Sequence, residues 1–293
     1  MANAVTSPDW WPSPAKLNLF LHILGKQENG YHSLQSLFQM LDHGDKLAFH
    51  VTNDNAVTMY EPLPGVPDSE NLIIRAANLL KPHAERKSAG AVITLEKVLP
   101  MGGGIGGGSS NAATTLVALN HLWNCGLSDG ELAELGLSLG ADVPIFVYGK
   151  TAFAQGVGED ITPCAQPEYW YLVVNPGIHI STAEVFSAPD LPRDTPAMLW
   201  DDYHYERTRN DCQEIVCNRY PEVAKLLQWL VHYAPSRMTG TGACVFATFT
   251  DQNLARQVQA MLPAPWQSFV AKGVNQSPLK QKLQEVNATS DTK

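Results

Sequence analysis

The sequence predicts an α/β (α+β) fold in two domains, and three observations support that prediction. The chain has 293 residues, enough for two domains of ordinary size. Segments that alternate between apolar and polar residues, as strands do, are interspersed with segments of helical spacing along the chain. About a third of the way along the chain, a strand-like segment, a glycine-rich loop and a helix start follow one another directly.

The first predicted strand runs from Pro12 to Leu24 and has a period of two. Residues 1–11 before it lack such a pattern, and we expect them to form a loose leader. Lys16 and Asn18 lie on the same face of the strand. Two interpretations are open: this is the solvated face of an edge strand, or the two residues provide a charged donor and an amide to a polar pocket.

A turn over residues 25–32 follows, with Asn29-Gly30 as its strongest signal. Tyr31 and His32 stand at the exit of this turn. They either pack locally or offer a flat aromatic ring and a hydrogen-bonding ring to a planar ligand. The next predicted elements are two strands, a loop rich in proline and glycine, and a helix, over residues 33–40, 45–52, 61–68 and 71–80.

The glycine-rich loop spans residues 100–108, and six of the seven residues from 102 to 108 are glycine. Ordering so much glycine is entropically unfavourable, so such a loop indicates a close approach of the backbone to another group. Residues 91–98 before the loop alternate like a strand, and a helix start with the N-cap residue types Ser109, Ser110 and Asn111 follows it. Free N–H groups and the positive end of the helix dipole therefore converge on one point, where we expect a nucleotide polyphosphate.

Other interpretations of the loop fit less well. Flexible linkers are usually longer and are not flanked closely by a strand and a helix. The dinucleotide-binding pattern G-x-G-x-x-G is present from Gly102 to Gly107, but the second strand with an acidic residue that should follow is missing. A Walker motif ending at Gly149-Lys150 fails because Pro144 replaces its first glycine, and the His-Arg-Asp and Asp-Phe-Gly motifs of protein kinases are absent.

Asp142 lies between a predicted helix over residues 128–139 and a new turn at Pro144. It is either the N-cap of that turn or a general base beside the phosphate loop. A second glycine turn occupies residues 239–242. The other elements predicted in the second half are strands over residues 169–174, 245–249 and 269–272 and helices over residues 181–186, 211–218, 222–233 and 254–261. We place two domains at residues 1–152 and 153–276, and we expect residues 277–293 to form a disordered tail.

The composition excludes several classes of protein. The net charge of −9 argues against binding to nucleic acids or anionic membranes. No apolar run approaches the roughly 18 residues that a membrane span needs, and the first residues lack the pattern of a secretory signal. Five cysteines without a C-x-x-C pair and nine histidines without ligand spacing argue against a disulfide framework and a zinc site. We therefore expect a cytoplasmic protein, monomeric or homodimeric, that acts on a small molecule.

Three segments together resemble the motifs of the GHMP kinase superfamily, which includes galactokinase, homoserine kinase and mevalonate kinase. They are Pro-Ala-Lys-Leu-Asn-Leu over residues 14–19, the loop over residues 100–112, and Thr-Gly-Thr-Gly-Ala over residues 239–243. Their order and spacing cover nearly the whole chain. Within the superfamily, the segments 15–21, 30–32, 140–144 and 236–243 resemble the members that phosphorylate 4-diphosphocytidyl-2-C-methyl-D-erythritol in non-mevalonate isoprenoid biosynthesis.

This resemblance implies the two-domain GHMP kinase fold, with the active site in the cleft between a nucleotide-binding and a substrate-binding domain. It implies transfer of phosphate from ATP to the 2-hydroxyl of that cytidine diphosphate substrate, which gives the 2-phosphate and ADP. The alternatives are another GHMP kinase of the homoserine or mevalonate type, a non-catalytic nucleotide sensor on the same fold, and a dehydrogenase.

The resemblance also implies roles for individual residues. Asp142 would be the general base for the 2-hydroxyl, and Lys16 would stabilise charge as the phosphoryl group moves. The substrate would be held by Asn18, Tyr31 and His32 at the cytidine end, by Phe186 across the cytosine from Tyr31 with Thr182 nearby, and by Thr241 and Gly242 from the second domain.

The residues implied at the nucleotide are mostly those of the glycine-rich loop. They are Pro100, Met101, Gly102, Gly103, Gly104, Ile105, Gly106, Gly107, Gly108, Ser109 and Ser110, with Asn71, Leu72 and Lys97 near the adenine. Mg²⁺ is expected with ATP. Its ligands stay open between Ser109, Ser110 and a shell of phosphates and water.

Overall fold

The computed structural model describes residues 8–28, 30, 32–158 and 160–290. Their strands form one sheet in the order β3-β4-β2-β10-β7-β9-β8, with β1 and β5 also paired to β2 and β6 paired to β5. The strands are β1 (Trp10–Lys26), β2 (His32–Thr52), β3 (Val57–Met59), β4 (Gly90–Glu96), β5 (Ala152–Gln155), β6 (Asp160–Pro163), β7 (Trp170–Asn175), β8 (Ser236–Met238), β9 (Val245–Phe249) and β10 (Gln267–Val274).

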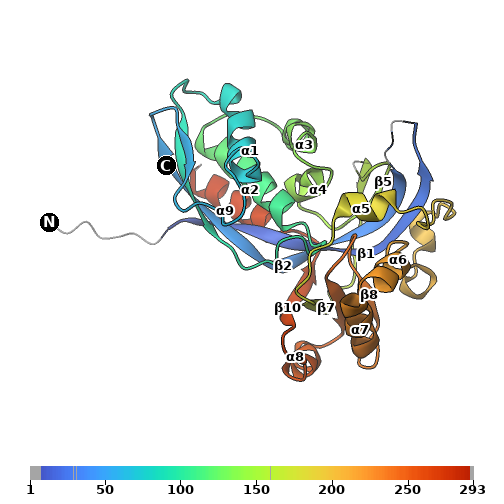
Figure 1. Ribbon diagram of the computed structural model, residues 1–293. Helices are drawn as coiled ribbons and strands as arrows, with labels where there is room; N and C mark the ends of the chain where they lie inside the picture. Colours follow the sequence, from blue (N-terminus) through green and yellow to red (C-terminus); the bar gives the residue numbers. More distant parts are fainter. Residues whose placement is uncertain (1–7, 29, 31, 159, 291–293) are drawn as a thin grey trace.

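Helices cover this sheet in two groups. Figure 1 shows α1–α4 and α9 on one side of the long β1–β2 pair, and α6–α8 with β7–β10 on the other. The helices are α1 (Leu72–Leu80), α2 (Gly107–Leu122), α3 (Asp129–Leu137), α4 (Val143–Tyr148), α5 (Thr182–Ser187), α6 (Gln213–Arg219), α7 (Pro221–Leu230), α8 (Gln252–Ala260) and α9 (Pro278–Ser290). Short 3₁₀ turns occupy Lys81–His83, Trp200–Asp202 and Tyr205–Arg207.

The antiparallel strands β1 and β2 run through both halves of the molecule, and β2 is one continuous strand where the sequence pattern predicted two. Strand β10 pairs with β2 at Gly273 and Val274 and with β7 along most of its length. It therefore joins the sheet of the first half to that of the second. Strand β1 contributes to more than one part of the core, because Leu17 and Leu21 are buried in different apolar clusters.

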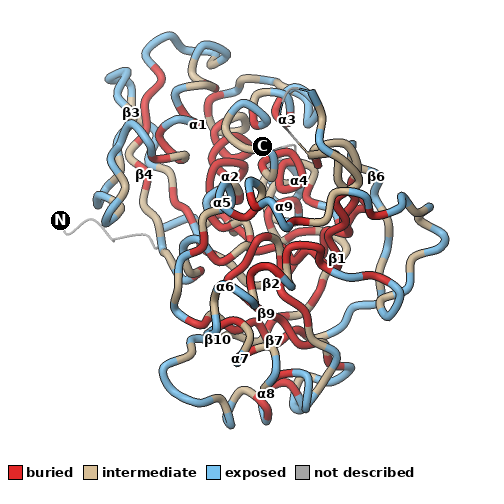
Figure 2. The backbone as a smooth tube through the Cα atoms, turned by 45° about the vertical axis from the view of Figure 1, so that its right-hand side comes forward, coloured by how far each residue is buried: buried red, intermediate tan, exposed pale blue. Residues whose placement is uncertain are grey.

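Three clusters of buried apolar side chains form the core. The first lies under α1–α4 and α9, and the second lies among α5–α8, β7 and β9. The third connects β1 to β7 and β9 through residues such as Leu17, Tyr171 and Phe246. The buried segments accordingly run through β1, β2 and α2 at the centre of the molecule, while exposed loops lie at the periphery (Figure 2).

Several predicted helix starts are confirmed, and one is wrong. Asn71 caps α1 by accepting a hydrogen bond from Ile73 N, and Ser128 forms a capping box with Glu131 at α3. Helix α2, however, begins at Gly107 and not at the serines, with Gly106 as an N-cap in the left-handed conformation (φ 76°). Backbone N–H groups of α2 therefore begin inside the glycine-rich loop.

Residues 10–11 and 278–290 are more ordered than the sequence pattern suggested. Strand β1 begins at Trp10, and Trp11 is buried in the first apolar cluster instead of belonging to a loose leader. The predicted disordered tail is wrong for residues 278–290, which form α9. Leu279 is fully buried, and Lys280 forms an ion pair of 2.6 Å with Asp129. The polar composition of this segment did not indicate a helix, because only a few of its side chains pack against the core.

Candidate active site

One large cavity, of about 960 Å³, contains most of the residues that the sequence analysis singled out. It is lined by the glycine-rich loop, by parts of β1, by the region around Asn71, by the start of α4, and by the second glycine turn with α5. Segments far apart in the sequence therefore meet at one place, between the two groups of helices. A cavity of this size holds a drug-sized or nucleotide-sized ligand.

The glycine-rich loop adopts a conformation that requires glycine. Gly102, Gly104 and Gly106 have φ values of 69°, 73° and 76°, which side chains disfavour. A Cβ atom on Gly104 would lie 2.4 Å from the carbonyl oxygen of Thr239. The loop thus packs directly against the second glycine turn, and the sequence run is explained by close contact between two backbones.

Most residues of the loop reach the cavity, but two do not. Ser109 lines it, whereas Ser110 is fully buried beneath it with its hydroxyl bonded to that of Ser13 at 3.0 Å. Ile105 packs into the third apolar cluster, and its carbonyl accepts a hydrogen bond from the backbone N–H of Lys16. Both residues therefore support the loop, and their side chains do not contact a ligand in the cavity.

Asn71, Leu72 and Lys97 line the cavity next to the loop. Oδ1 of Asn71 caps α1, while its Nδ2 is buried without a hydrogen-bond partner in the described part of the chain. A buried amide donor without a partner is costly, so it fits an acceptor on a bound ligand. Leu72 lies 3.5 Å from a Cβ built on Gly108, which closes the apolar side of this region.

Asp45 is a buried carboxylate that sequence reasoning did not select. Its Oδ1 accepts hydrogen bonds from the backbone N–H groups of Val98 and Leu99, both at 2.8 Å. Its Oδ2 pairs with Lys97 Nζ at 2.7 Å and accepts from Asn111 Nδ2 at 3.2 Å. Asp45 thus holds together the entry to the glycine-rich loop, Asn111 near the start of α2, and Lys97 in the cavity wall. Its position in an alternating strand gave no signal of this.

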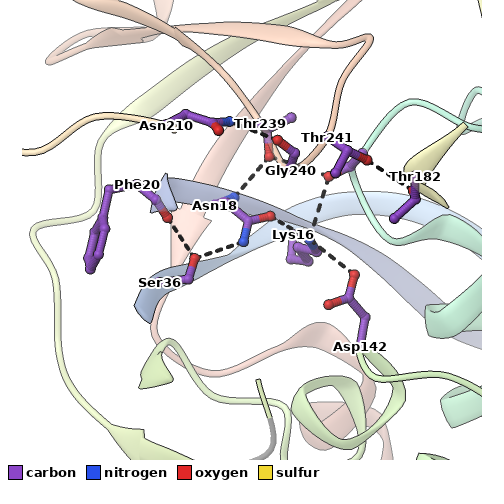
Figure 3. Close-up of polar contacts among 11 residues, drawn as sticks. Lys16, Asn18, Phe20, Ser36, Asp142, Thr182, Asn210, Thr239, Gly240 and Thr241 are labelled. Carbon is purple, nitrogen blue, oxygen red and sulfur yellow. Dashed lines mark hydrogen bonds and ion pairs between the residues drawn. The ribbon is translucent and has the colours of Figure 1, made fainter. Parts of the chain in front are cut away.

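Lys16 and Asp142 meet in the cavity. Lys16 Nζ lies 3.2 Å from Asp142 Oδ2 and 2.5 Å from Asn18 Oδ1, and the close-up in Figure 3 shows these contacts. The Lys16 side chain is 3% exposed and that of Asp142 is 36% exposed. Asp142 occupies the N-cap position of α4 but makes no side-chain capping bond. Its carboxylate is therefore directed to the lysine and remains accessible to a ligand.

Asn18 is engaged on both sides of its amide. Its Oδ1 accepts from Lys16, its Nδ2 donates to Ser36 Oγ at 2.7 Å, and Ser36 donates to the carbonyl of Phe20 at 2.6 Å. Its backbone N–H donates to Thr239 Oγ1 at 2.9 Å. Of the two interpretations of this strand face, the structure confirms a polar pocket, because Lys16 and Asn18 are buried and line the cavity.

The second glycine turn faces the cavity from the other half of the molecule. Thr241 lines the cavity, and its hydroxyl lies 2.9 Å from that of Thr182 on α5. Gly242 lies behind the turn, against Met238 and Ile180, and is not in the cavity wall. Asn210 holds the turn by donating to the carbonyls of Met238 and Gly240, both at 2.8 Å. Figure 3 shows Asn210 beside Gly240.

An aromatic pair closes one end of the cavity. The rings of His32 and Phe186 stack with centroids 5.2 Å apart and an interplanar angle of 27°. Arg193 Nε donates to His32 Nε2 at 3.0 Å. Tyr31, the predicted partner of Phe186, lies outside the described residues. Within those residues, His32 is the ring that meets Phe186.

Two kinds of feature are missing from the described residues. No group of three or more His, Cys, Asp or Glu side chains in them is arranged to hold a metal ion. None of their helices is long and apolar enough to cross a membrane. The cavity wall nevertheless includes side-chain oxygen atoms, among them those of Glu70, Ser109 and Asp142.

Two segments of the chain match families of known proteins. Residues 71–150 match the GHMP kinases N terminal domain, and residues 204–268 match the GHMP kinases C terminal domain. The first match covers the glycine-rich loop and Asp142, and the second covers the second glycine turn.

Relatives over the whole length are more informative. A 4-diphosphocytidyl-2-C-methyl-D-erythritol kinase from Pseudoalteromonas atlantica is 61% identical over 96% of this chain and 98% of its own length. The enzyme of that name from Shewanella woodyi is 56% identical over 94% of this chain and 97% of its own.

Solved structures give the same assignment. The crystal structure of a 4-(cytidine 5'-diphospho)-2C-methyl-D-erythritol kinase superposes with a TM-score of 0.80 at 30% identity, covering 90% of this chain and 99% of that one. The mevalonate kinase of Methanococcus jannaschii, at 15% identity and a TM-score of 0.64 over 93% of this chain and 100% of that one, shares the fold. This chain therefore belongs to the 4-diphosphocytidyl-2-C-methyl-D-erythritol kinase family of the GHMP kinases.

Proposed function

We propose that this ATP-dependent kinase uses Asp142 as general base and Lys16 as the stabilising cation when it phosphorylates the 2-hydroxyl of 4-diphosphocytidyl-2-C-methyl-D-erythritol. The observation that carries this assignment is the ion pair of 3.2 Å between the two side chains, at the meeting point of β1, α4 and the glycine-rich loop. Asp142 is the partly exposed member, so a hydroxyl group can reach it.

The proposed step is a single phosphoryl transfer. The Asp142 carboxylate accepts the proton of the 2-hydroxyl, and the oxygen forms a bond to the γ-phosphorus of ATP. The bond from that phosphorus to the bridging oxygen breaks, and ADP leaves. Such a reaction depends on positioning and on stabilisation of charge more than on covalent chemistry. A buried lysine beside the reacting groups provides that charge where water is excluded.

Lys16 is held for this role by its neighbours. Asn18 and the carbonyl of Gly104, at 3.5 Å, accept from its ammonium, and the ring of Phe38 lies 5.0 Å away. We therefore assign Asn18 to the positioning of Lys16, because both ends of its amide are already bonded. This differs from the contact with cytidine that the sequence resemblance implied.

ATP would be bound by the glycine-rich loop and the start of α2, with the base beside Asn71, Leu72 and Lys97. The unpartnered Nδ2 of Asn71 supports this orientation, since adenine offers ring nitrogens as acceptors. Mg²⁺ with few protein ligands would neutralise phosphate charge, and the Ser109 hydroxyl is the donor that the loop presents to the cavity. Ser110 is excluded from this role by its burial.

The two halves of the molecule would bind different parts of the reaction, one the nucleotide and the other the acceptor substrate. The first apolar cluster, with α9, would carry the nucleotide site, and the second would carry α5 and the glycine turn that face the substrate. His32 and Phe186 would hold the cytidine end by stacking and hydrogen bonding. A cytoplasmic location and a monomeric or homodimeric state complete the proposal.

The test is formation of ADP from Mg-ATP with 4-diphosphocytidyl-2-C-methyl-D-erythritol as acceptor and homoserine, mevalonate and galactose as controls. We expect turnover with the cytidyl substrate alone. Turnover with one of the control alcohols instead would keep the phosphate site but overturn the proposed substrate pocket.

A further inference from the structure

Arg193 lies behind the aromatic end of the cavity and holds its two rings together. Its guanidinium Nε donates to His32 Nε2 at 3.0 Å. Its Nη2 donates to the carbonyls of Phe186 at 3.0 Å and Ala188 at 2.7 Å, and its Nη1 donates to that of Leu191 at 3.0 Å. Arg193 itself is not in the cavity wall, whereas His32 and Phe186 are.

This contact determines which nitrogen of His32 carries the proton. A guanidinium group has only donors, so Nε2 of His32 must accept with its lone pair. The ring is therefore neutral, and its single N–H is on Nδ1. Partial burial lowers the pKa of His32, and the charges of Arg193 and Lys26 lower it further. These two cations are the charged groups that act on the ring.

The same guanidinium also fixes the second ring. Its bonds to the carbonyls of Phe186 and Ala188 hold the end of α5, where Phe186 stacks on His32. One side chain thus connects the start of β2 to the end of α5. Both aromatic rings at this end of the cavity, His32 and Phe186, are therefore held in place by Arg193.

We infer that Arg193 is a positioning residue for recognition of the pyrimidine base. It keeps His32 neutral with Nδ1 as a donor, which suits a ring acceptor such as N3 of cytosine, and it keeps Phe186 in place as a stacking surface. Uracil carries a proton on N3 and repels such a donor, so the arrangement selects cytosine over uracil. This inference rests on the proposed function, because it assumes that the cytidine end binds between α5 and β2.

The experiment compares wild type with Arg193→Ala, Arg193→Lys and the matched control Arg219→Ala, whose guanidinium pairs with Asp190 on the surface. The probes are cytidine diphosphate and uridine diphosphate in calorimetric titrations, together with the KM of both substrates. For Arg193→Ala we expect a KM for the cytidyl substrate about tenfold higher, with the kcat and the KM for ATP within about twofold of wild type. The tenfold factor corresponds to the loss of one hydrogen bond between neutral groups, here the bond from His32 Nδ1 to the base.

The pH profile separates this role from a structural one. Without Arg193 the neutral ring is free to place its proton on Nε2, and its pKa rises toward the ordinary value of about 6.5. Below that pH both nitrogens carry protons, so the Nδ1 donor returns. The binding defect of Arg193→Ala should therefore be largest at pH 8 and smaller at pH 6, while wild type changes little.

Three outcomes overturn the inference. They are an unchanged preference for cytidine over uridine diphosphate in Arg193→Ala, a defect that is independent of pH, or an equal rise in the KM for ATP. Arg193→Lys keeps a donor for His32 and should fall between wild type and Arg193→Ala, which preserves the test if the alanine variant does not fold. Failure of wild type to phosphorylate the cytidyl substrate would instead contradict the proposed function.

Discussion

At the scale of single residues, the site depends on two carboxylate–lysine pairs, each with one buried member: Lys16 in one pair and Asp45 in the other. Lys16 with Asp142 lies where ligands can reach the carboxylate, whereas Lys97 with Asp45 has its carboxylate fully enclosed. A buried ion pair that loses one partner leaves an uncompensated charge. We therefore expect substitutions in the Lys16–Asp142 pair to affect catalysis. We expect a substitution in the Lys97–Asp45 pair to affect stability and nucleotide binding.

Replacement of Asp142 by Asn should lower kcat by about 10²-fold or more, because the proposed general base is lost. Lys16→Met should reduce kcat to a comparable extent, as the loss of one charge-stabilising donor does. Steady-state kinetics with both substrates measures this. Near-normal turnover of Asp142→Asn would show that the base lies elsewhere.

Replacement of Asp45 by Asn should destabilise the fold by about 3 kcal/mol, since Lys97 loses its partner in a buried network. The KM for ATP should rise more than the KM for the acceptor, because the entry to the glycine-rich loop loosens. Urea unfolding and steady-state kinetics measure the two effects. Asp42→Asn on the same strand is the matched control, because Asp42 is exposed and accepts one backbone bond, and a similar loss of stability there would refute this view of Asp45.

At the scale of elements, helix α9 and the two glycine turns decide how distant segments meet. The glycine-rich loop fits the turn over residues 239–242 because neither carries a Cβ at the contact of Gly104 and Gly240. Helix α9 returns the end of the chain to the first apolar cluster, where Leu279 is buried. The last helix therefore packs in the half that contains the glycine-rich loop, although it follows the other half in sequence.

Truncation of Leu279 to Ala should reduce the free energy of unfolding by about 2–5 kcal/mol, as for other fully buried leucines. The control is Leu254→Ala on α8, where the side chain is 49% exposed and the expected change is within about 0.5 kcal/mol. Chemical denaturation measures both. Equal, small effects would mean that α9 does not belong to the core in solution.

At the scale of the whole molecule, partly buried histidines couple stability to pH. Burial is the main cause that lowers the pKa of His22, His32 and His43. A lowered pKa in the folded state means that protons bind more tightly to the unfolded chain. The free energy of unfolding is therefore highest above the pKa of histidine in the unfolded chain, about 6.5. It decreases as the pH falls below that value.

The midpoint of urea unfolding should consequently fall between pH 7.5 and pH 5.5. His43→Gln should reduce this dependence, because it removes one of the groups that resist protonation. A midpoint that rises over the same range, or a variant with an unchanged profile, would show that these histidines are not responsible.

Much of the fold could be predicted from neighbouring residues. The strand at Val245–Phe249 and the capped start of α1 agree with the predictions, because alternation and capping act between residues a few positions apart. The extension of β1 to Trp10 and the existence of α9 could not be predicted in this way. They depend on burial of Trp11 and Leu279 against segments distant in the sequence.

By itself, the sequence determined a glycine-rich loop at a helix start and the common face of Lys16 and Asn18, since both follow from local backbone geometry. Only the tertiary structure decided that Lys16 meets Asp142, that Asn18 holds the lysine, and that Arg193 holds His32. The physical reason is that hydrogen bonds and ion pairs require atoms within about 3 Å. Contacts between residues that are far apart in the sequence exist only after the core has packed.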